Sequence, residues 1–162
     1  GWMKAIGEHI AANPGVEIVS EEQRSGATKE SAQTASENLL ERFTEDGELT
    51  VDAIFCPNES SAYGMLMALR NKRYAGKVKF VGFDASKALI VGLARGEIHG
   101  LVLQNPERMG YLGVKTMVEH LRGGDVPRRV DTGVTLITAE DLDKPETKAL
   151  VPQVDEWLKD VK

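Results

Sequence analysis

Three polar side chains follow directly after apolar runs of the sequence, and their types suit the binding of a ligand. Asn58 follows the run at 51–56, Asp84 closes the run at 78–83, and Gln104 ends the run at 98–103. An aspartate can accept hydrogen bonds from two hydroxyl groups, whereas asparagine and glutamine amides both donate and accept. This set suits a polyhydroxyl ligand, and the charge-assisted bonds to Asp84 would be the strongest.

Each of these residues also has an explanation that needs no ligand. Asn58 and Asp84 each precede a helical pattern, so they could be helix N-caps worth about 1 kcal/mol each. Gln104 could be an exposed loop glutamine, since Asn105 is better placed to cap a helix that begins at Pro106. The corresponding positions of the three residues favour a binding rim, because ligands of open α/β sheets bind beyond the carboxyl ends of the strands.

The sequence lacks the usual motifs of catalysis and of metal binding. His9, His99 and His120 lie far apart, outside any HExxH or Cys/His spacing, so we expect neither a metal nor another cofactor. There is no GxGxxG and no GxSxG, and a loop-like Gly-Lys pattern at 110–116 is interrupted by Val114 inside a helix. An enzyme that used Asp84 as a base would lack a paired acid or nucleophile. We therefore expect binding without catalysis.

These side chains must be positioned by a regular alternation of strands and helices. Apolar runs predict strands at 16–19, 51–56, 78–83, 98–103 and 134–138. Apolar stripes predict helices at 3–10, 32–43 with Thr28 as N-cap, 62–69, 89–93 with Gly96 as C-cap, and 106–121. Residues 45–48 are expected to form an acidic loop, and 140–162 a polar tail with helical turns. The predicted fold class is α/β, a doubly wound parallel sheet with helices on both faces.

Composition narrows the class of protein further. Twenty Lys and Arg against 25 Asp and Glu give a net charge of −5 and a pI near 5.3, which argues against a nucleic-acid partner. The 162 residues fit one domain or a large fragment of a bigger protein. No stretch approaches the roughly 18 apolar residues of a membrane span. The sequence does not open with a basic stretch followed by an apolar one, so we expect no signal segment within these residues. The single cysteine, Cys56, is expected to be a small buried hydrophobe.

The chain resembles the second half of a periplasmic sugar-binding protein of the ribose/galactose type, a type I periplasmic binding protein. The resemblance covers most of residues 2–138. It is carried by Ala-Ile-Phe-Cys-Pro-Asn-Glu at 53–59 with Gly64, Val-Gly-Phe-Asp at 81–84, and Gln-Asn-Pro at 104–106 with Gly110 and Gly113.

The resemblance implies the substrate-binding component of a sugar ABC transporter. In this family two α/β lobes close on a sugar, and a membrane permease recognises the closed form. The match implies that Asn58, Asp84 and Gln104 contact a monosaccharide such as ribose or xylose. It also implies a location in the periplasm, or outside the cell on a lipid anchor. The residue near Ala27 falls where ribose binders present an aromatic residue, and the chain lacks one there, which leaves the particular sugar open.

The resemblance also implies a division of the chain. Residues 1–104 would form a second-lobe α/β domain without its first strand. Residues 105–129 would form a helix and linker that pack on the first lobe in the family, and 130–162 a returning strand and polar tail. With the N-terminal lobe missing, the apolar face of this helix has no partner, so we expect the fragment to form a dimer or a swapped dimer. The residues of that face are Val114, Met117, Val118 and Leu121.

Two other functions fit the same resemblance. Transcription repressors of the lactose-repressor family share the fold, but they require a basic helix-turn-helix upstream, and the chain shows neither that segment nor a basic charge balance. Leu-Gln-Asn-Pro at 103–106 and Val-Asp-Thr-Gly-Val at 130–134 are closer to the transporter group. A sensor ectodomain of a signalling receptor is the other alternative.

Overall fold

The computed structural model describes the backbone of residues 2–21 and 23–161, and the side chains of 6–21, 23–159 and 161. Its helices are α1 (Trp2–Ala12), α2 (Lys29–Arg42), α3 (Glu59–Asn71), α4 (Lys87–Ala94), α5 (Pro106–Leu121), α6 (Pro145–Leu150) and α7 (Val154–Trp157). Its strands are β1 (Thr44–Glu45), β2 (Glu48–Leu49), β3 (Ala53–Phe55), β4 (Lys79–Phe83), β5 (Gly100–Leu103) and β6 (Thr135–Ile137). Short 3-10 turns, η1 (Ala139–Asp141) and η2 (Leu158–Asp160), complete the chain.

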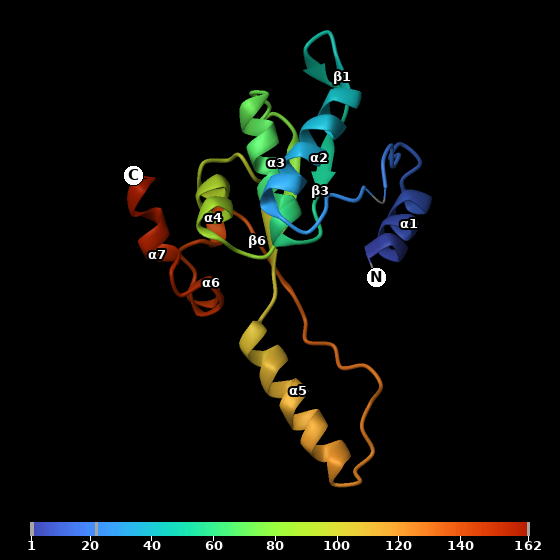
Figure 1. The fold of residues 1–162 in the computed structure, drawn as a ribbon, viewed down its shortest axis with the longest axis vertical. Coiled ribbons are helices and arrows are strands. Elements are labelled where there is room, and N and C mark those ends of the chain that lie inside the picture. Colours follow the sequence, from blue (N-terminus) through green and yellow to red (C-terminus); the bar gives the residue numbers. More distant parts are fainter. Residues whose placement is uncertain (1, 22, 162) are drawn as a thin grey trace.

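The central sheet has the strand order β3-β4-β5-β6. The first three strands are parallel, and their register places Phe55 beside Val81 and Phe83 beside Val102. The returning strand β6 pairs antiparallel with β5. The predicted α/β alternation is therefore confirmed for β3, β4 and β5. Their carboxyl ends lie at one edge of the sheet (Figure 1).

The alternating burial along strand β4 follows from the way the strand packs in the core. Phe80 and Gly82 are buried on one face of the strand, while Val81 and Phe83 on the other face are half-buried. A Cβ at Gly82 would lie 3.1 Å from Ala62 Cβ of α3 and 3.0 Å from Leu101 Cδ2 of β5. The glycine of the Val-Gly-Phe-Asp segment therefore fits the close approach of α3 to the sheet, where a larger residue would have to displace the Ala62 or Leu101 side chain.

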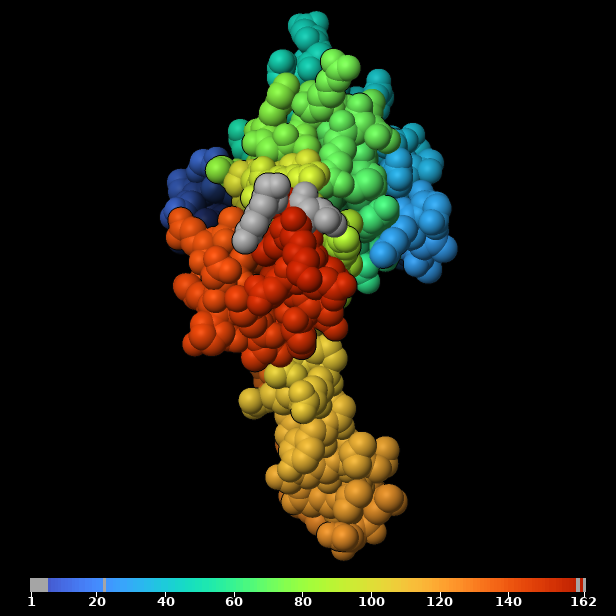
Figure 2. Space-filling view, turned by 90° about the vertical axis from the view of Figure 1, so that its left-hand side faces the viewer, coloured from blue at the N-terminus to red at the C-terminus, as the bar shows by residue number. Residues whose placement is uncertain are grey.

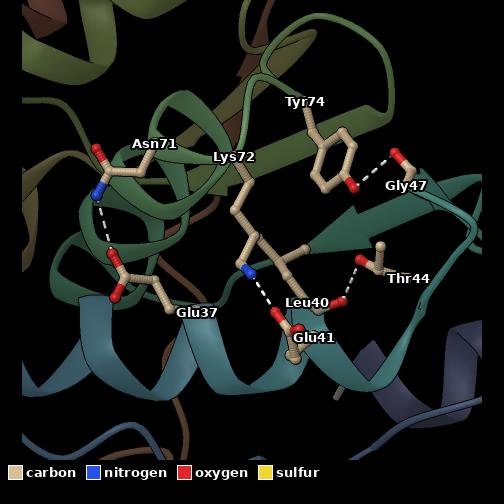
Figure 3. A network of polar contacts seen from close by, with 8 residues as sticks. All are labelled: Glu37, Leu40, Glu41, Thr44, Gly47, Asn71, Lys72 and Tyr74. Carbon is tan, nitrogen blue, oxygen red and sulfur yellow. Dashed lines mark hydrogen bonds and ion pairs between the residues drawn. The ribbon is translucent and has the colours of Figure 1, made fainter.

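Helices α2 and α3 pack against each other and are joined by polar contacts at their edges (Figure 3). Asn71 Nδ2 donates to Glu37 Oε1 at 2.9 Å, and Lys72 pairs with Glu41. The helices approach most closely at Gly64, where an added Cβ would lie 2.5 Å from the backbone of α2. Thr28 caps α2 as predicted, by accepting from the Ser31 N–H at 3.1 Å.

The acidic segment predicted as a loop is a β-hairpin instead. Strands β1 and β2 pair antiparallel, and the turn between them has positive φ at Asp46 and Gly47. Asp-Gly is a preferred pair for such a turn, and the acidic composition concealed this signal. The Tyr74 hydroxyl donates to the Gly47 carbonyl at 2.9 Å, which ties the hairpin to the end of α3 (Figure 3).

The prediction of a strand at 16–19 is also wrong. The segment runs without a strand partner among the described residues, and Val16 and Val19 are 46% and 55% exposed. In the doubly wound strand order 2-1-3-4-5 the second strand lies at the edge of the sheet and pairs with the first strand alone. Residues 2–12 form helix α1, so the apolar alternation at 16–19 has no neighbouring strand to pair with.

Helix α5 and the segment that returns from it to β6 form an arm that extends away from the sheet (Figures 1 and 2). None of the 16 residues of α5 is buried, and Val114 and Leu121 are 68% and 77% exposed. The apolar face predicted for this helix thus has no cover from the described residues. No helix in the described part of the chain has the length and apolar character needed to cross a membrane.

The C-terminal tail is packed rather than merely polar. Leu142, Thr147, Val151 and Val154 are buried, and helix α7 contacts α4. The predicted helical turns are present as η1, α6, α7 and η2. Figure 2 shows this tail, in orange and red, against the body of the molecule directly above the start of α5.

Candidate functional site

Asp84 and Gln104 meet at the carboxyl ends of neighbouring strands. The Asp84 N–H donates to the Val102 carbonyl at 2.8 Å, which continues the β4–β5 ladder one residue past β4. Asp84 then turns with φ of 64°, in the left-handed region that aspartate tolerates better than most residues. Gln104 Nε2 donates to Asp84 Oδ1 at 2.8 Å. The two side chains predicted from strand ends are thus in direct contact.

The alternative explanations of these two residues do not hold. The N-cap of α4 is Ser86, two residues beyond Asp84, so Asp84 does not cap that helix. Asn105 caps α5 by accepting from the Arg108 N–H at 2.9 Å, as predicted. Gln104 is half-buried and bonded to Asp84, and is not an exposed loop glutamine.

Asn58, by contrast, is a helix cap. Its Oδ1 accepts from the Ser61 N–H at 2.9 Å and from the Ser60 hydroxyl at 3.0 Å, at the start of α3. Asn58 does not line the pocket that holds Asp84 and Gln104. Its contact with a ligand remains a prediction, whereas its structural role is defined.

A pocket of about 330 Å³ opens at these strand ends. Its polar lining comes from Glu59, Asp84 and Gln104. Its apolar lining comes from Ala85, Leu103 and Pro106 beside the strand ends, and from Leu150 and Val151 of the C-terminal tail. A small number of polar groups surrounded by apolar side chains is typical of pockets that bind small molecules.

Glu59 is a pocket residue that sequence reasoning missed. It occupies the first position of α3, directly after Asn58, and this adjacency was the signal that could have identified it. Lys29 Nζ lies 2.8 Å from Glu59 Oε1 and 4.8 Å from the centre of the Tyr63 ring. The hydrogen bond to Glu59 raises the pKa of Lys29 above its usual value. The ion pair offsets part of the negative charge that Glu59 brings to the pocket.

Leu150 and Val151 are the other missed residues. They lie 46 and 47 positions after Gln104 in a tail whose sequence shows no strong period, so no local pattern connects them to the strand ends. Their place in the pocket depends on the packing of Val151 and Val154 into the core. No sequence signal was available for them.

The remaining reactive groups of the described residues do not assemble into a second site. Burial raises the pKa of the Cys56 thiol to about 12, so this thiol is protonated and unreactive at neutral pH. Among the side chains of residues 6–21, 23–159 and 161, no three His, Cys, Asp or Glu groups cluster closely enough to hold a metal ion. The chemistry that the pocket offers is hydrogen bonding and apolar contact.

Comparison with known proteins finds similarity to periplasmic binding proteins. A family model described as periplasmic binding protein domain matches residues 1–125. The D-allose-binding periplasmic protein of Escherichia coli is 34% identical over 76 residues, which are 47% of this chain and 24% of that protein. The ribose import binding protein RbsB of Bacillus subtilis is 26% identical over 136 residues, 83% of this chain and 42% of that protein.

A solved structure shows the same fold. The ABC transporter solute binding protein from Agrobacterium vitis with bound D-fucose superposes with a TM-score of 0.77 at 30% identity, over 91% of this chain and 49% of that one. The chain therefore spans half or less of the length of these relatives. The family model covers most of the chain, and the strand ends form a pocket of the expected type. The chain belongs to the periplasmic binding protein domain family.

Proposed function

We propose that this chain is the second-lobe half of a sugar-binding protein of an ABC transporter, and that it binds one face of a monosaccharide. The observation that carries the proposal is the contact between Gln104 and Asp84 in a pocket at the strand ends. Its relatives are named as binding proteins for allose and for ribose, and one solved neighbour holds D-fucose. We infer binding without catalysis and without a metal or other cofactor.

The contact with Gln104 orients the Asp84 carboxylate and still leaves capacity for a ligand. A carboxylate has about four lone-pair sites, and Gln104 uses one of them on Oδ1. Sugar hydroxyls can donate to the others. The Gln104 carbonyl oxygen adds a further acceptor, and its amide has a second proton to donate. Acceptors dominate the pocket, so a neutral polyol fits it better than an acidic or phosphorylated sugar.

The whole protein would work by closing two lobes on the sugar. A ligand that contacts both lobes stabilises the closed state through its extra affinity for that state. We propose that the closed surface is recognised by the permease in the periplasm or at the outer face of the cell. A single lobe supplies only part of the polar and apolar contacts, so we expect this chain alone to bind weakly, with Kd of about 1 mM.

We further propose that a first lobe covers the apolar face of α5. The chain matches half or less of the length of its relatives, and α5 carries its exposed apolar residues on an arm beyond the sheet. The proposed division at 104 lies two residues before the start of α5, and the one at 129 lies within the segment that connects α5 to β6. When the chain is studied by itself, two copies would associate through the same face.

The proposal is tested by NMR titration of the isotope-labelled chain with ribose, allose, arabinose and fucose. We expect saturable shifts of the Asp84, Ala85 and Gln104 amides for at least one sugar, with little change in the β1–β2 hairpin. Allose 6-phosphate should bind more weakly than allose. The absence of saturable shifts for all of these sugars would contradict the proposed function.

A further inference from the structure

We propose that Leu150, in the C-terminal tail, is a specificity-determining residue that limits the size of the sugar. This inference rests on the proposed function, since it concerns the same pocket. Its evidence is the position of one aliphatic side chain between two neighbouring cavities.

The tail holds Leu150 in a fixed place. Val151 and Val154 are 4% and 0% exposed, so the residues after Leu150 are anchored in the core. The Val151 N–H donates to the Thr147 carbonyl at 2.8 Å, and the Val154 N–H donates to the Val151 carbonyl at 3.0 Å. Leu150 itself is only half-buried, because part of its side chain faces open space.

Leu150 lines two cavities. The first is the 330 Å³ pocket with Asp84 and Gln104. The second, of about 180 Å³, lies where α5 begins and where the returning segment reaches β6, and its lining includes Asn105, Arg108 and Thr135. Leu103 is the other residue that the two linings share. Leu150 and Leu103 therefore stand between the sugar pocket and the second cavity.

Of these two residues, Leu150 is the one whose side chain can change without altering the sheet. Leu103 belongs to β5, is 2% exposed and pairs with Thr135 of β6. Leu150 is the last residue of α6 and has no strand partner. Shortening Leu150 would extend the sugar pocket toward the second cavity while the Asp84–Gln104 contact stays in place.

The tail also supplies an apolar surface that a sugar ring can contact. One face of a sugar ring consists largely of C–H groups, which bind best against an apolar side chain. Ala27 is exposed and does not line the pocket, and the pocket has no aromatic residue in its lining. Leu150 and Val151 supply the apolar surface there, so the tail takes part in selecting the ligand.

The experiment compares Leu150→Ala with the unaltered chain and with Leu158→Ala. Leu158 is also a half-buried tail leucine, but it lines neither cavity. NMR titrations would use the best-binding free sugar and its methyl glycoside. We expect Leu150→Ala to weaken the binding of the free sugar about tenfold and to weaken the binding of the methyl glycoside less. The ratio of the two affinities should therefore shift at least threefold. Leu158→Ala should leave the ratio unchanged.

Two results would overturn the inference, and they are distinguishable. If the unaltered chain binds sugar and Leu150→Ala keeps the parent ratio, Leu150 does not limit ligand size and the proposed function stands. If the unaltered chain binds no sugar, the proposed function fails and the inference fails with it. Amide spectra of both variants must retain the dispersion of the parent, and a Leu150→Met variant, which keeps the side-chain volume, should retain the parent ratio.

Discussion

Gln104 Nε2 donates a hydrogen bond of 2.8 Å to Asp84 Oδ1, and the bond joins the ends of two parallel strands. The residues are 20 positions apart in the sequence, and the β4–β5 register brings them together. The bond uses one lone pair of the carboxylate and fixes its direction. A preorganised acceptor of this kind binds a hydroxyl group without first losing side-chain freedom.

Removal of the Gln104 amide should therefore weaken sugar binding more than it weakens the fold. In Gln104→Leu the Asp84 carboxylate loses its partner, and we expect binding to weaken about fivefold to tenfold for a loss of roughly 1 kcal/mol. The matched control is Gln153→Leu, an exposed tail residue. Equal affinities of Gln104→Leu and the parent in an NMR titration would show that the contact does not position Asp84.

The close packing around Gly64 leads to a prediction about the stability of the fold rather than about binding. Because its added Cβ would lie 2.5 Å from the α2 backbone, Gly64→Ala should push α2 away from α3 and destabilise the fold by about 1 to 3 kcal/mol. Gly110→Ala, on the exposed helix α5 with open space around it, should instead be neutral or slightly stabilising. Urea unfolding followed by circular dichroism measures both, and a Gly64→Ala midpoint equal to that of the parent would refute the close packing.

Much of this fold could be predicted from the sequence because its signals are local. The apolar runs that became β3, β4 and β5, the Thr28 cap and the Asn105 cap each depend on neighbouring residues. Strand 16–19 failed because a strand needs a neighbour, and apolar alternation does not reveal whether one is present. The turn at Asp46 and Gly47 was not predicted because the acidic composition of this segment is typical of a solvated loop, although Asp-Gly also favours a hairpin turn.

Some residues of the candidate site could likewise be predicted from the sequence, and others could not. Asp84 and Gln104 follow from the rule that strand ends carry ligands, and the structure brings them together. Asn58 satisfied the same rule, yet its side chain caps α3 outside the pocket lining. Leu150 could not have been predicted, because it reaches the pocket through the packing of Val151 and Val154, which are distant in sequence from β4 and β5.

The surroundings of His99 allow us to predict how the stability of the fold depends on pH. Burial, followed by the charge of Lys79, lowers the pKa of His99 below its ordinary value of 6.5. The Phe80 N–H donates to His99 Nδ1 at 3.2 Å, a bond that only the neutral ring can accept. Between the lowered pKa and 6.5 the unfolded chain binds more protons than the folded chain, so stability must fall as pH falls through this window.

The measurement is the free energy of unfolding between pH 7 and pH 5. His99→Asn keeps an acceptor near the Phe80 N–H and removes the titrating ring, so the decline below pH 6.5 should become shallower. His120→Asn, at the exposed end of α5, is the control and should follow the parent. A His99→Asn curve parallel to that of the parent would assign the decline to other groups.

The exposed face of α5 predicts association of the chain when it is studied alone. Val114 and Leu121 are among the most exposed apolar side chains of the described residues, so sedimentation should show a dimer whose fraction rises with concentration. Val114→Glu should shift the chain toward monomer, whereas Glu119→Lys, on the opposite side of the helix, should have little effect. A monomer at millimolar concentration for the unaltered chain would contradict this prediction.

The most direct test of sugar binding at these strand ends compares Asp84→Asn with Asp125→Asn in the same NMR titration. Asparagine tolerates the left-handed backbone at position 84, where alanine would add strain, so the substitution removes the charge and keeps the turn. Loss of the charge-assisted bonds should weaken binding of the best sugar roughly 10-fold to 100-fold, while Asp125→Asn, in the exposed segment after α5, should bind like the parent. Equal affinities for Asp84→Asn and the parent would place the sugar elsewhere and contradict the proposed site.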